Sequence, residues 1–252
     1  MPDLINNYQP ADNSMAGKTV LITGAAGGLG SSLAHAAAGL GANLVLLDNN
    51  EKALNLLHDS IETDTGKQPG LYPLDIRGAS PDDYQQLAET INEVFNGLNG
   101  LVHCAATLGQ ISPFDNIDAK HWQDTFTTNL HGPVLMTQSL LPLIRRSGNG
   151  SIIFTTDDKN SAYWGAYGVS KASITPTMRI IADELDSLID ANKNFPVTCN
   201  AVNPGPMRTN IRSSAFPGED PNTICKPQDK VPAFLYLLSE EARGLNGNVI
   251  EL

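Results

Sequence analysis

Tyr167 and Lys171 lie four residues apart, just after an apolar run, and side chains of these two types could together move a proton. Free tyrosine has a pKa of about 10, which is too high for a base at neutral pH. A lysine one helical turn away lies beside the phenol, and its positive charge favours the phenolate. The pair could therefore take a proton from an alcohol or return one to a carbonyl group.

A site of this kind also needs a hydroxyl donor to hold the substrate oxygen, usually a serine at the end of the preceding strand. Here that run ends in Thr155, Thr156, Asp157 and Asp158. Thr156 is our first candidate because it carries a hydroxyl. Asp157 is the second, although an ionised carboxylate there would disfavour the phenolate and repel negative charge on the substrate oxygen. Ser161, further along the loop, is the third, and the absence of any substitute is the remaining alternative.

The elements that must position these side chains are short apolar runs that alternate with helix-like segments. Continuous apolar strands are typical of a parallel sheet covered by helices. We therefore predict an α/β fold, a single-domain doubly wound parallel sheet of the Rossmann type, with about seven strands and helices on both faces. Residues 1–16 are expected to form a polar N-terminal arm, residues 17–252 the domain, and residues 210–230 a substrate lid. The clearest strands are predicted in "KTVLITG", "ANLVLLD", "GLVHCAA", "GSIIFTT" and "FPVTCNAVNPG".

A glycine-rich turn between the first strand and the first helix indicates a dinucleotide site. Gly24, Gly28 and Gly30 would let the backbone approach a pyrophosphate at a helix N-terminus. Asp48 ends the second strand, where a carboxylate can accept hydrogen bonds from the adenosine ribose and repel a 2′-phosphate. We therefore predict NAD rather than NADP, with a turn or helix-cap role as the alternative for Asp48. Asp75 could reach the adenine, or it could be a turn residue.

Composition excludes several other classes. The formal net charge of -11 argues against a nucleic-acid binder, and no apolar stretch is long enough to span a bilayer. Three scattered cysteines form no disulfide framework, and the five histidines show no metal-ligand spacing. We expect a cytoplasmic protein with no metal, no nucleic-acid partner and no membrane partner.

These motifs together resemble the short-chain dehydrogenase/reductase family over nearly the whole chain, roughly residues 18–252. The matching segments are "TGAAGGLG" at residues 23–30, "TTNLHGP" at 127–133, "YGVSK" at 167–171 and "NPG" at 203–205. The resemblance implies an NAD(H)-dependent oxidoreductase that interconverts an alcohol and a ketone or aldehyde, with Tyr167 as acid/base. Lys171 would also hold the nicotinamide ribose, and Asn129 would support a water that relays protons. Pro133 should disturb that helix and free a carbonyl for the water. The cofactor-binding residues that we predict are Gly24, Gly28, Leu29, Gly30, Asp48, Asp75, Ile76, Ala105, Tyr167, Lys171, Pro204, Gly205 and Thr209.

Two departures from the family pattern stand out. Cys104, Ala105 and Ala106 stand where the family usually has Asn-Ala-Gly, and we interpret Cys104 as a small buried residue. The family serine falls about thirteen residues before the tyrosine, which here is Phe154, whereas alignment on the strand gives Asp157. The connecting loop therefore looks shortened by about three residues. A second hypothesis follows, a dinucleotide-binding protein with weak or no catalysis that acts as a sensor or assembly subunit.

Two further expectations concern the domain size and the assembly. An epimerase of the same superfamily would need a larger C-terminal region than the one present here. The family resemblance implies a homodimer or homotetramer, with the helix of residues 173–189 either between subunits or over the sheet. Leu108, Trp164 and Met207 are expected to wall the substrate cleft.

Overall fold

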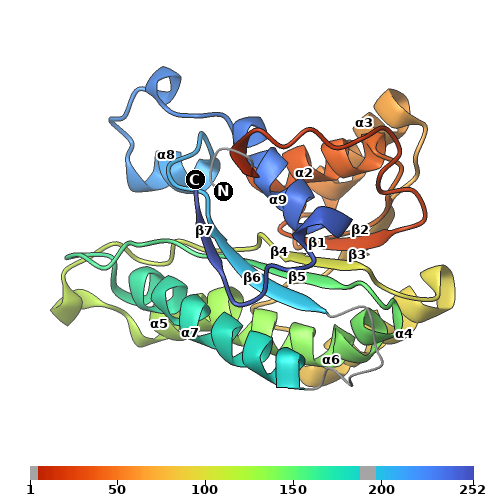
Figure 1. Cartoon of the computed structure of the whole chain (residues 1–252). Coiled ribbons are helices and arrows are strands. Elements are labelled where there is room, and N and C mark those ends of the chain that lie inside the picture. Colours follow the sequence, from red (N-terminus) through yellow and green to blue (C-terminus); the bar gives the residue numbers. More distant parts are fainter. Residues whose placement is uncertain (1–4, 188–196) are drawn as a thin grey trace.

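The computed structural model describes residues 5–187 and 197–252, and these residues form a three-layer α/β unit (Figure 1). Seven parallel strands make one sheet in the order β3-β2-β1-β4-β5-β6-β7. This confirms the predicted doubly wound sheet with helices on both faces. The strands are β1 Thr19–Thr23, β2 Asn43–Asp48, β3 Gly70–Pro73, β4 Gly100–His103, β5 Ser151–Thr155, β6 Thr198–Asn203 and β7 Val249–Glu251.

Helices cover the sheet in two layers that are separated in Figure 1. One layer contains α2 Gly28–Gly39, α3 Glu51–Thr65 and α9 Val231–Leu237. The other contains α4 Pro81–Phe95, α5 Ala119–Phe126, α6 Gly132–Arg146 and α7 Gly165–Ser187. Helix α8 (Asn210–Ala215) stands at the carboxyl edge of the sheet. A π-helix, Thr127–His131, joins α5 to α6, and short 3-10 turns occupy Phe114–Asn116, Pro221–Thr223, Pro227–Lys230 and Glu240–Ala242.

Local sequence explains where the helices begin and end. Helix α4 begins with a capping box between Ser80 and Asp83, which satisfies free N–H groups of its first turn. It ends at Asn96 in the left-handed conformation, and α3 ends in the same way at Gly66. Helix α7 buries Ile174, Met178 and Leu185 in the core below the sheet, so its apolar face covers the sheet. The end of the predicted 173–189 segment and the start of the predicted sixth strand lie outside the described residues.

The switch in strand order decides where a ligand can bind. The chain leaves β3 at one edge and returns as β4 on the other side of β1, so the loops that follow β1 and β4 diverge. In open α/β sheets this divergence leaves a crevice at the carboxyl ends of the strands. The register aligns Thr23 with His103 and His103 with Phe154, so the glycine loop and the β5 end open onto one crevice.

The N-terminal segment packs on the α2 and α9 side of the sheet. Ile5, Tyr8 and Met15 are buried there, and the Tyr8 hydroxyl donates a hydrogen bond to Glu241. Isolated apolar residues without a period gave no sequence signal for this packing. Among the described helices, none is long and apolar enough to cross a membrane.

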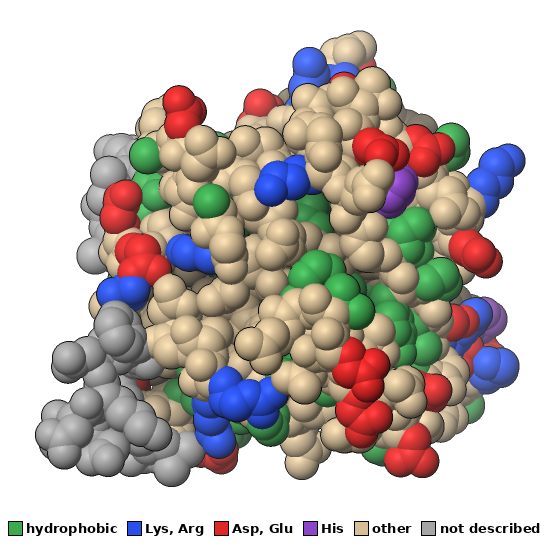
Figure 2. Space-filling view, turned by 90° about the vertical axis from the view of Figure 1, so that its right-hand side faces the viewer, with side chains coloured by type: hydrophobic (Ala, Val, Ile, Leu, Met, Phe, Trp, Pro, Cys, Tyr) green, Lys and Arg blue, Asp and Glu red, His purple; other side chains and the backbone are tan. Residues whose placement is uncertain are grey.

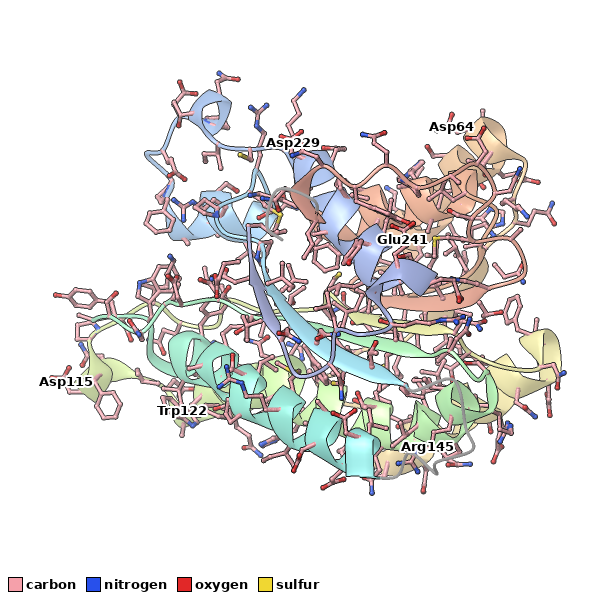
Figure 3. All side chains as sticks on the ribbon, viewed as in Figure 1. Asp64, Asp115, Trp122, Arg145, Asp229 and Glu241 are labelled. Carbon is pink, nitrogen blue, oxygen red and sulfur yellow. The ribbon has the colours of Figure 1, made fainter. Side chains whose placement is uncertain are left out.

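The surface carries charges of both signs. Figure 2 shows acidic and basic side chains interspersed on one face, without an extended basic patch there. Figure 3 places Asp115 and Trp122 at one end of the α5/α7 layer and Arg145 toward the opposite end.

Candidate active site

The candidate active site is a cleft along the carboxyl ends of β1, β4, β5 and β6. A cavity of about 480 Å³ is lined by the glycine loop, the β5 end, α7 and the 204–216 segment. A second cavity of about 220 Å³ adjoins it and shares Gly24, Gly27, Cys104, Ala106 and Ile211. Together they line one groove, whose residues include the ends of the strands from β2 to β6.

The glycine loop is held by contacts that exclude side chains. Gly24 has a φ of +63°, and a Cβ there would lie 2.6 Å from backbone atoms of Ala105. A Cβ on Gly30 would lie 2.3 Å from the Gly24 carbonyl oxygen, and one on Gly28 would lie 3.0 Å from Thr209. Leu29 lies at the start of α2 and lines the larger cavity. The loop thus leaves the N-terminus of α2 open to the cleft, as a pyrophosphate site requires.

Asp48 faces the smaller cavity from the end of β2. Its carboxylate accepts hydrogen bonds from the backbone N–H groups of Ala26 at 3.1 Å and Asn50 at 3.0 Å. A carboxylate has about four acceptor positions, so two remain for a ribose. Asp48 therefore holds the glycine loop in place, and its position is compatible with the predicted ribose contact.

The other predicted cofactor residues surround the same groove. Asp75, Ile76 and Ala105 line the smaller cavity, and the Asp75 carboxylate is engaged by Arg77 at 2.7 Å. The Ala105 N–H donates to the Thr23 hydroxyl at 3.2 Å. Pro204, Gly205 and Thr209 line the larger cavity.

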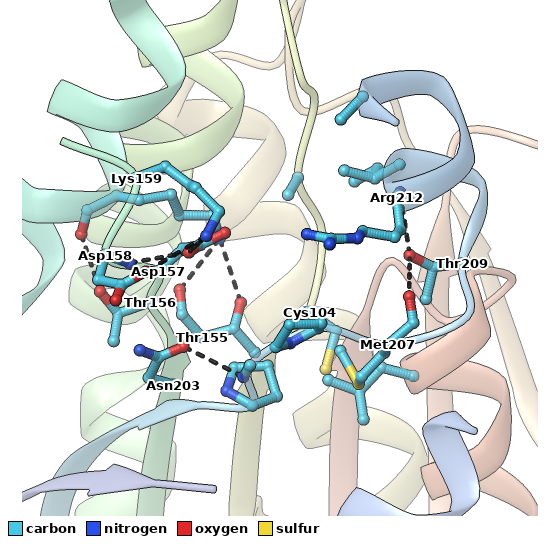
Figure 4. A pocket seen from close by; sticks show the side chains of 18 of the residues that line it. Cys104, Thr155, Thr156, Asp157, Asp158, Lys159, Asn203, Met207, Thr209 and Arg212 are labelled. Atoms are coloured by element: carbon cyan, nitrogen blue, oxygen red, sulfur yellow. Dashed lines mark hydrogen bonds and ion pairs between the residues drawn. The ribbon is translucent and has the colours of Figure 1, made fainter. Parts of the chain in front are cut away.

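Tyr167 and Lys171 of α7 line the larger cavity together with the end of β5. Figure 4 shows Thr155, Thr156 and Asp157 from the β5 end at this cavity. The buried ammonium group of Lys171 donates to the Thr155 carbonyl oxygen at 3.0 Å and lies 3.3 Å from its hydroxyl. Burial lowers the pKa of Lys171 to about 8, although the negative charge of Asp157 opposes that shift.

The three candidates for the serine position lie differently. The Asp157 carboxylate accepts a hydrogen bond from the Tyr167 hydroxyl at 2.9 Å. The hydroxyl of Thr156 donates to the Lys171 carbonyl oxygen at 2.9 Å, so it does not face the phenol. Ser161 is exposed on the loop. In this structure, therefore, the nearest polar partner of Tyr167 is the carboxylate, whereas our order of candidates placed Thr156 first.

The contact with Asp157 changes the electrostatics of the tyrosine. Burial, the negative charge of Asp157 and the hydrogen bond to it all hold the pKa of Tyr167 well above its usual range. Tyr167 is therefore a neutral phenol in this arrangement. It can donate a proton, but it cannot act as a base while the carboxylate holds it.

Asn129 lies in the π-helix, 2% exposed. Its side chain accepts from the Thr107 N–H at 2.8 Å and donates to the Thr107 carbonyl and to Ser170. It thus fastens the loop after β4 to α7. Pro133 has no N–H to donate to the Asn129 carbonyl, and the chain forms a π-helix over Thr127–His131 just before it.

Sequence reasoning did not single out several residues of the cleft. Lys159 lies 3.9 Å from Asp157 and 3.5 Å from Asp158. Arg212 is held by Glu219 through two contacts of 2.6 Å. Trp164 and Met207 line the larger cavity as expected, but Leu108 does not. The charged residues in the loop before Tyr167 could have indicated Lys159 from the sequence. The Arg212–Glu219 pair depends on the turn after α8, which the sequence does not reveal.

Two groups near the cleft carry no catalytic assignment. Burial raises the pKa of the Cys104 thiol to about 12, which fits a small packing residue better than a nucleophile. Burial lowers the pKa of His103 to about 3, so this histidine is neutral.

On α3, His58, Asp59 and Glu62 place ligand atoms within 4.8 Å of one another, but such acidic surface groups are common without an ion.

Comparisons with known proteins agree with this geometry. The short chain dehydrogenase family model matches residues 18–220. The chain is 34% identical over 244 residues to the uncharacterized oxidoreductase YciK of Escherichia coli, covering 96% of this chain and 94% of that protein. A short chain dehydrogenase from Shigella flexneri superposes with a TM-score of 0.91 at 34% identity, over 98% and 94% of the two chains. Another from Shigella flexneri, solved with NADP, gives a TM-score of 0.90 at 33% identity, over 96% and 99%.

Proposed function

Because this chain belongs to the short-chain dehydrogenase family, we propose that it is an NAD(P)-dependent oxidoreductase in which Tyr167 carries the substrate proton. The observation that carries this proposal is the shared cleft. Tyr167 and Lys171 line the same cavity as Gly24 and Gly30 of the glycine loop. When bound, the dinucleotide would supply or accept a hydride.

The residues of the groove fit such a cofactor. Gly24, Gly28 and Gly30 leave room for phosphates where side chains would collide, and the smaller cavity could accept the adenosine end. Asp48 supports a preference for NAD, since its carboxylate would repel a 2′-phosphate. The described residues that line this cavity include no Lys or Arg to offset that repulsion. Relatives solved with NADP and NADPH make the preference a matter for measurement.

The chain's own residues would act on a carbon–heteroatom double bond or its reduced form. In the reductive direction the neutral Tyr167 is already in the protonation state that donates. Lys171 would lower the cost of the resulting phenolate, and Asn129 would hold the loop after β4 in place. The alcohol and carbonyl pair implied by the family is our general proposal for the substrate. Such a substrate must displace Tyr167 from Asp157.

Tyr167→Phe tests this function in the full chain. We expect oxidation of NADH or NADPH by a panel of small aldehydes, ketones and imines to fall by about 10²–10⁴-fold. The dissociation constant of the dinucleotide should change by less than about threefold, because the phenol acts on the substrate. Tyr163→Phe is the matched control, since Tyr163 is an exposed tyrosine at the same end of the molecule. Equal activity in wild type and Tyr167→Phe would overturn the assignment.

The contact of 2.9 Å between Tyr167 and Asp157 favours a second candidate, a dinucleotide-binding protein with weak or no catalysis. Such a protein would bind NADH or NADPH and turn over none of the panel. Asp157→Ser would then create activity that the wild type lacks.

We also propose that the protein is a homodimer or homotetramer. Val169 and Ile180 of α7 are exposed apolar residues, 48% and 61% accessible in the single chain. Sedimentation equilibrium would give the mass directly, and a monomer at micromolar concentration would contradict this proposal.

A further inference from the structure

Asp157 is a fixed carboxylate at the position where the reacting atom of a substrate would meet Tyr167. One of its oxygens accepts from the Tyr167 hydroxyl at 2.9 Å, and the other accepts from the Asp158 N–H at 2.8 Å. Its side chain is 25% exposed, whereas that of Asp158 is 76% exposed. The carboxylate is therefore held toward the cleft by two groups, and Asp158 points to solvent.

A carboxylate at this position favours reduction of a protonated C=N bond and disfavours reduction of a C=O bond. A carbonyl oxygen gains negative charge when hydride adds to its carbon, and an ionised carboxylate nearby repels that charge. A protonated C=N group begins as a cation and becomes neutral on reduction. Its N–H group donates a charge-assisted hydrogen bond to a carboxylate that can only accept.

The cations near Asp157 interact with its charge, but two of the three have their hydrogen-bond partners elsewhere. Lys171 is directed to Thr155, and Arg212 is held by the two oxygens of Glu219. Lys159 lies 3.9 Å from Asp157, and it also forms an ion pair with Asp158 at 3.5 Å. Figure 4 shows Asp157, Asp158 and Lys159 on one side of the cavity and Arg212 on the other. An incoming cation would therefore compete with one partly exposed lysine for direct contact with Asp157, in the presence of the more distant charges of Lys171 and Arg212.

The walls near Asp157 also suit a cationic ligand with an apolar body. The rings of Trp164 and Phe216 lie 5.8 Å apart, and both line the cavity of about 480 Å³. Each ring already faces a cation, Lys159 at 5.8 Å from Trp164 and Arg212 at 3.8 Å from Phe216. Aromatic faces attract cations through the ring quadrupole, so these walls tolerate positive charge.

We propose that the substrate of this site is a small protonated imine, reduced to an amine or formed from one, and that Asp157 selects its positive nitrogen. This inference rests on the oxidoreductase function proposed above. In the reductive direction the iminium carbon accepts hydride from the reduced dinucleotide, and the π pair of the C=N bond becomes the nitrogen lone pair. For an imine that binds already protonated, the products are a neutral amine and the oxidised dinucleotide, so charge and electrons balance without a further reactant. For an imine that binds unprotonated, Tyr167 first donates its proton to the nitrogen and is left as a phenolate.

The test compares matched imines and ketones on the full chain. Pyrroline is measured against cyclopentanone, and dihydroisoquinoline against tetralone, with NADH and with NADPH. We expect kcat/KM for the imines to exceed that for the ketones by about tenfold or more in the wild type. Asp157→Asn and Asp157→Ser should reverse this ratio, while Asp158→Asn, which removes a neighbouring carboxylate, should keep it within about threefold.

A binding measurement decides the inference independently of turnover. Calorimetric titration with pyrrolidinium should show affinity that falls by about tenfold or more in Asp157→Asn and is kept in Asp158→Asn. Ketone reduction without an imine preference would overturn the inference and leave the oxidoreductase function intact. Dinucleotide binding with reduction of no probe would overturn the proposed function, and equal pyrrolidinium affinity in wild type and Asp157→Asn would overturn the inference.

Discussion

The two ends of the cleft are constrained in different ways. At the dinucleotide end, Gly24 and Gly30 are required by backbone atoms that lie where a side chain would begin. At the catalytic end, the residue beside Tyr167 is Asp157, which lies on the loop after β5. At the dinucleotide end, steric constraints leave no alternative to glycine. Polar constraints at the catalytic end allow a change of charge within the same fold.

The residues at the cofactor end therefore indicate the family of the chain, whereas those at the catalytic end indicate which reaction this particular protein carries out. A Cβ placed 2.3 Å from a carbonyl oxygen must displace the backbone. A substitution of Gly30 would therefore lower both the stability of the fold and the affinity for the dinucleotide. The exchange of a hydroxyl for a carboxylate alters the pKa of Tyr167 and the charge that the cleft prefers. The following predictions would break or sharpen this contrast, in order of expected effect.

Gly30→Ala should have the largest effect, because the new methyl group collides with the Gly24 carbonyl. We expect a loss of about 1–3 kcal/mol in the free energy of unfolding and at least about a hundredfold weaker dinucleotide binding. Gly39→Ala is the matched control at the other end of α2, where a Cβ meets nothing within 4 Å. It should be neutral or should stabilise by about 0.5–1 kcal/mol. Unchanged dinucleotide affinity in Gly30→Ala would remove the steric side of the comparison.

Asp157→Ser should lower the raised pKa of Tyr167 at the catalytic end. The wild type should show no tyrosinate absorbance from Tyr167 below pH of about 10, after subtraction of the Tyr167→Phe titration. In Asp157→Ser the pKa of Tyr167 should fall by about one to three units, because burial remains but the negative charge and its hydrogen bond are lost. Asp158→Asn should leave the wild-type result unchanged. A wild-type signal below that pH would show that Asp157 does not hold the phenol neutral in solution.

Lys171→Met tests the cost of a buried charge at the same end. Burial lowers the pKa of Lys171 to about 8 in the folded chain, whereas an unfolded lysine has a value of about 10.4. Between these values the unfolded chain binds the extra proton, so the contribution of Lys171 to stability increases as pH rises. The unfolding free energy of wild type minus Lys171→Met should increase by roughly 2 kcal/mol from pH 8 to 9.5.

Urea titrations at fixed pH values without dinucleotide would measure this difference. Lys52→Met, which removes an exposed lysine of α3, should show no comparable slope. A flat difference for Lys171→Met would mean that the negative charge of Asp157 offsets burial fully.

The sequence predicted the parts of the molecule that depend on periodicity and glycine. Buried strands read as continuous apolar runs, and Gly24, Gly28 and Gly30 followed the first of them, so the sheet and its loop could be expected. The position of Tyr167 relative to Lys171 depends only on helix geometry. The four-residue spacing between Asn129 and Pro133 also predicted a disturbed helix, which is present as the π-helix.

The order of candidates for the serine position could not be settled from the sequence. That order depends on the path of the chain after Thr155, where strand alternation no longer fixes which side chain faces the cleft. Thr156 turns its hydroxyl to the Lys171 carbonyl, and Asp157 turns to Tyr167. Residue counting predicts a loop that is shorter by about three residues, but it gives no direction for the chain. Burial of Ile5 and Tyr8 was missed for a similar reason, because tertiary contacts alone determine it.

Asp48→Asn should have the smallest effect, and it tests whether the dinucleotide end also carries a choice made by charge. The wild type should bind NADH at least about tenfold more tightly than NADPH, since the carboxylate faces the adenosine cavity. Asparagine keeps a side-chain acceptor for the Ala26 N–H and removes the negative charge. We therefore expect NADPH affinity to rise by about tenfold and NADH affinity to fall by only a few fold.

The related structures with NADP and NADPH make the opposite result informative. If the wild type binds NADPH as tightly as NADH, the two hydrogen bonds from Ala26 and Asn50 define Asp48 as a brace for the glycine loop rather than a ribose ligand. Asp75→Asn is the matched control, because Asp75 lines the same cavity but its carboxylate is paired with Arg77. Fluorescence titration of both variants with both dinucleotides separates the roles. If the relative affinity for NADH and NADPH changes in Asp48→Asn but not in Asp75→Asn, a charged side chain selects the ligand at each end of the cleft. The contrast between the two ends would then apply only to the glycines.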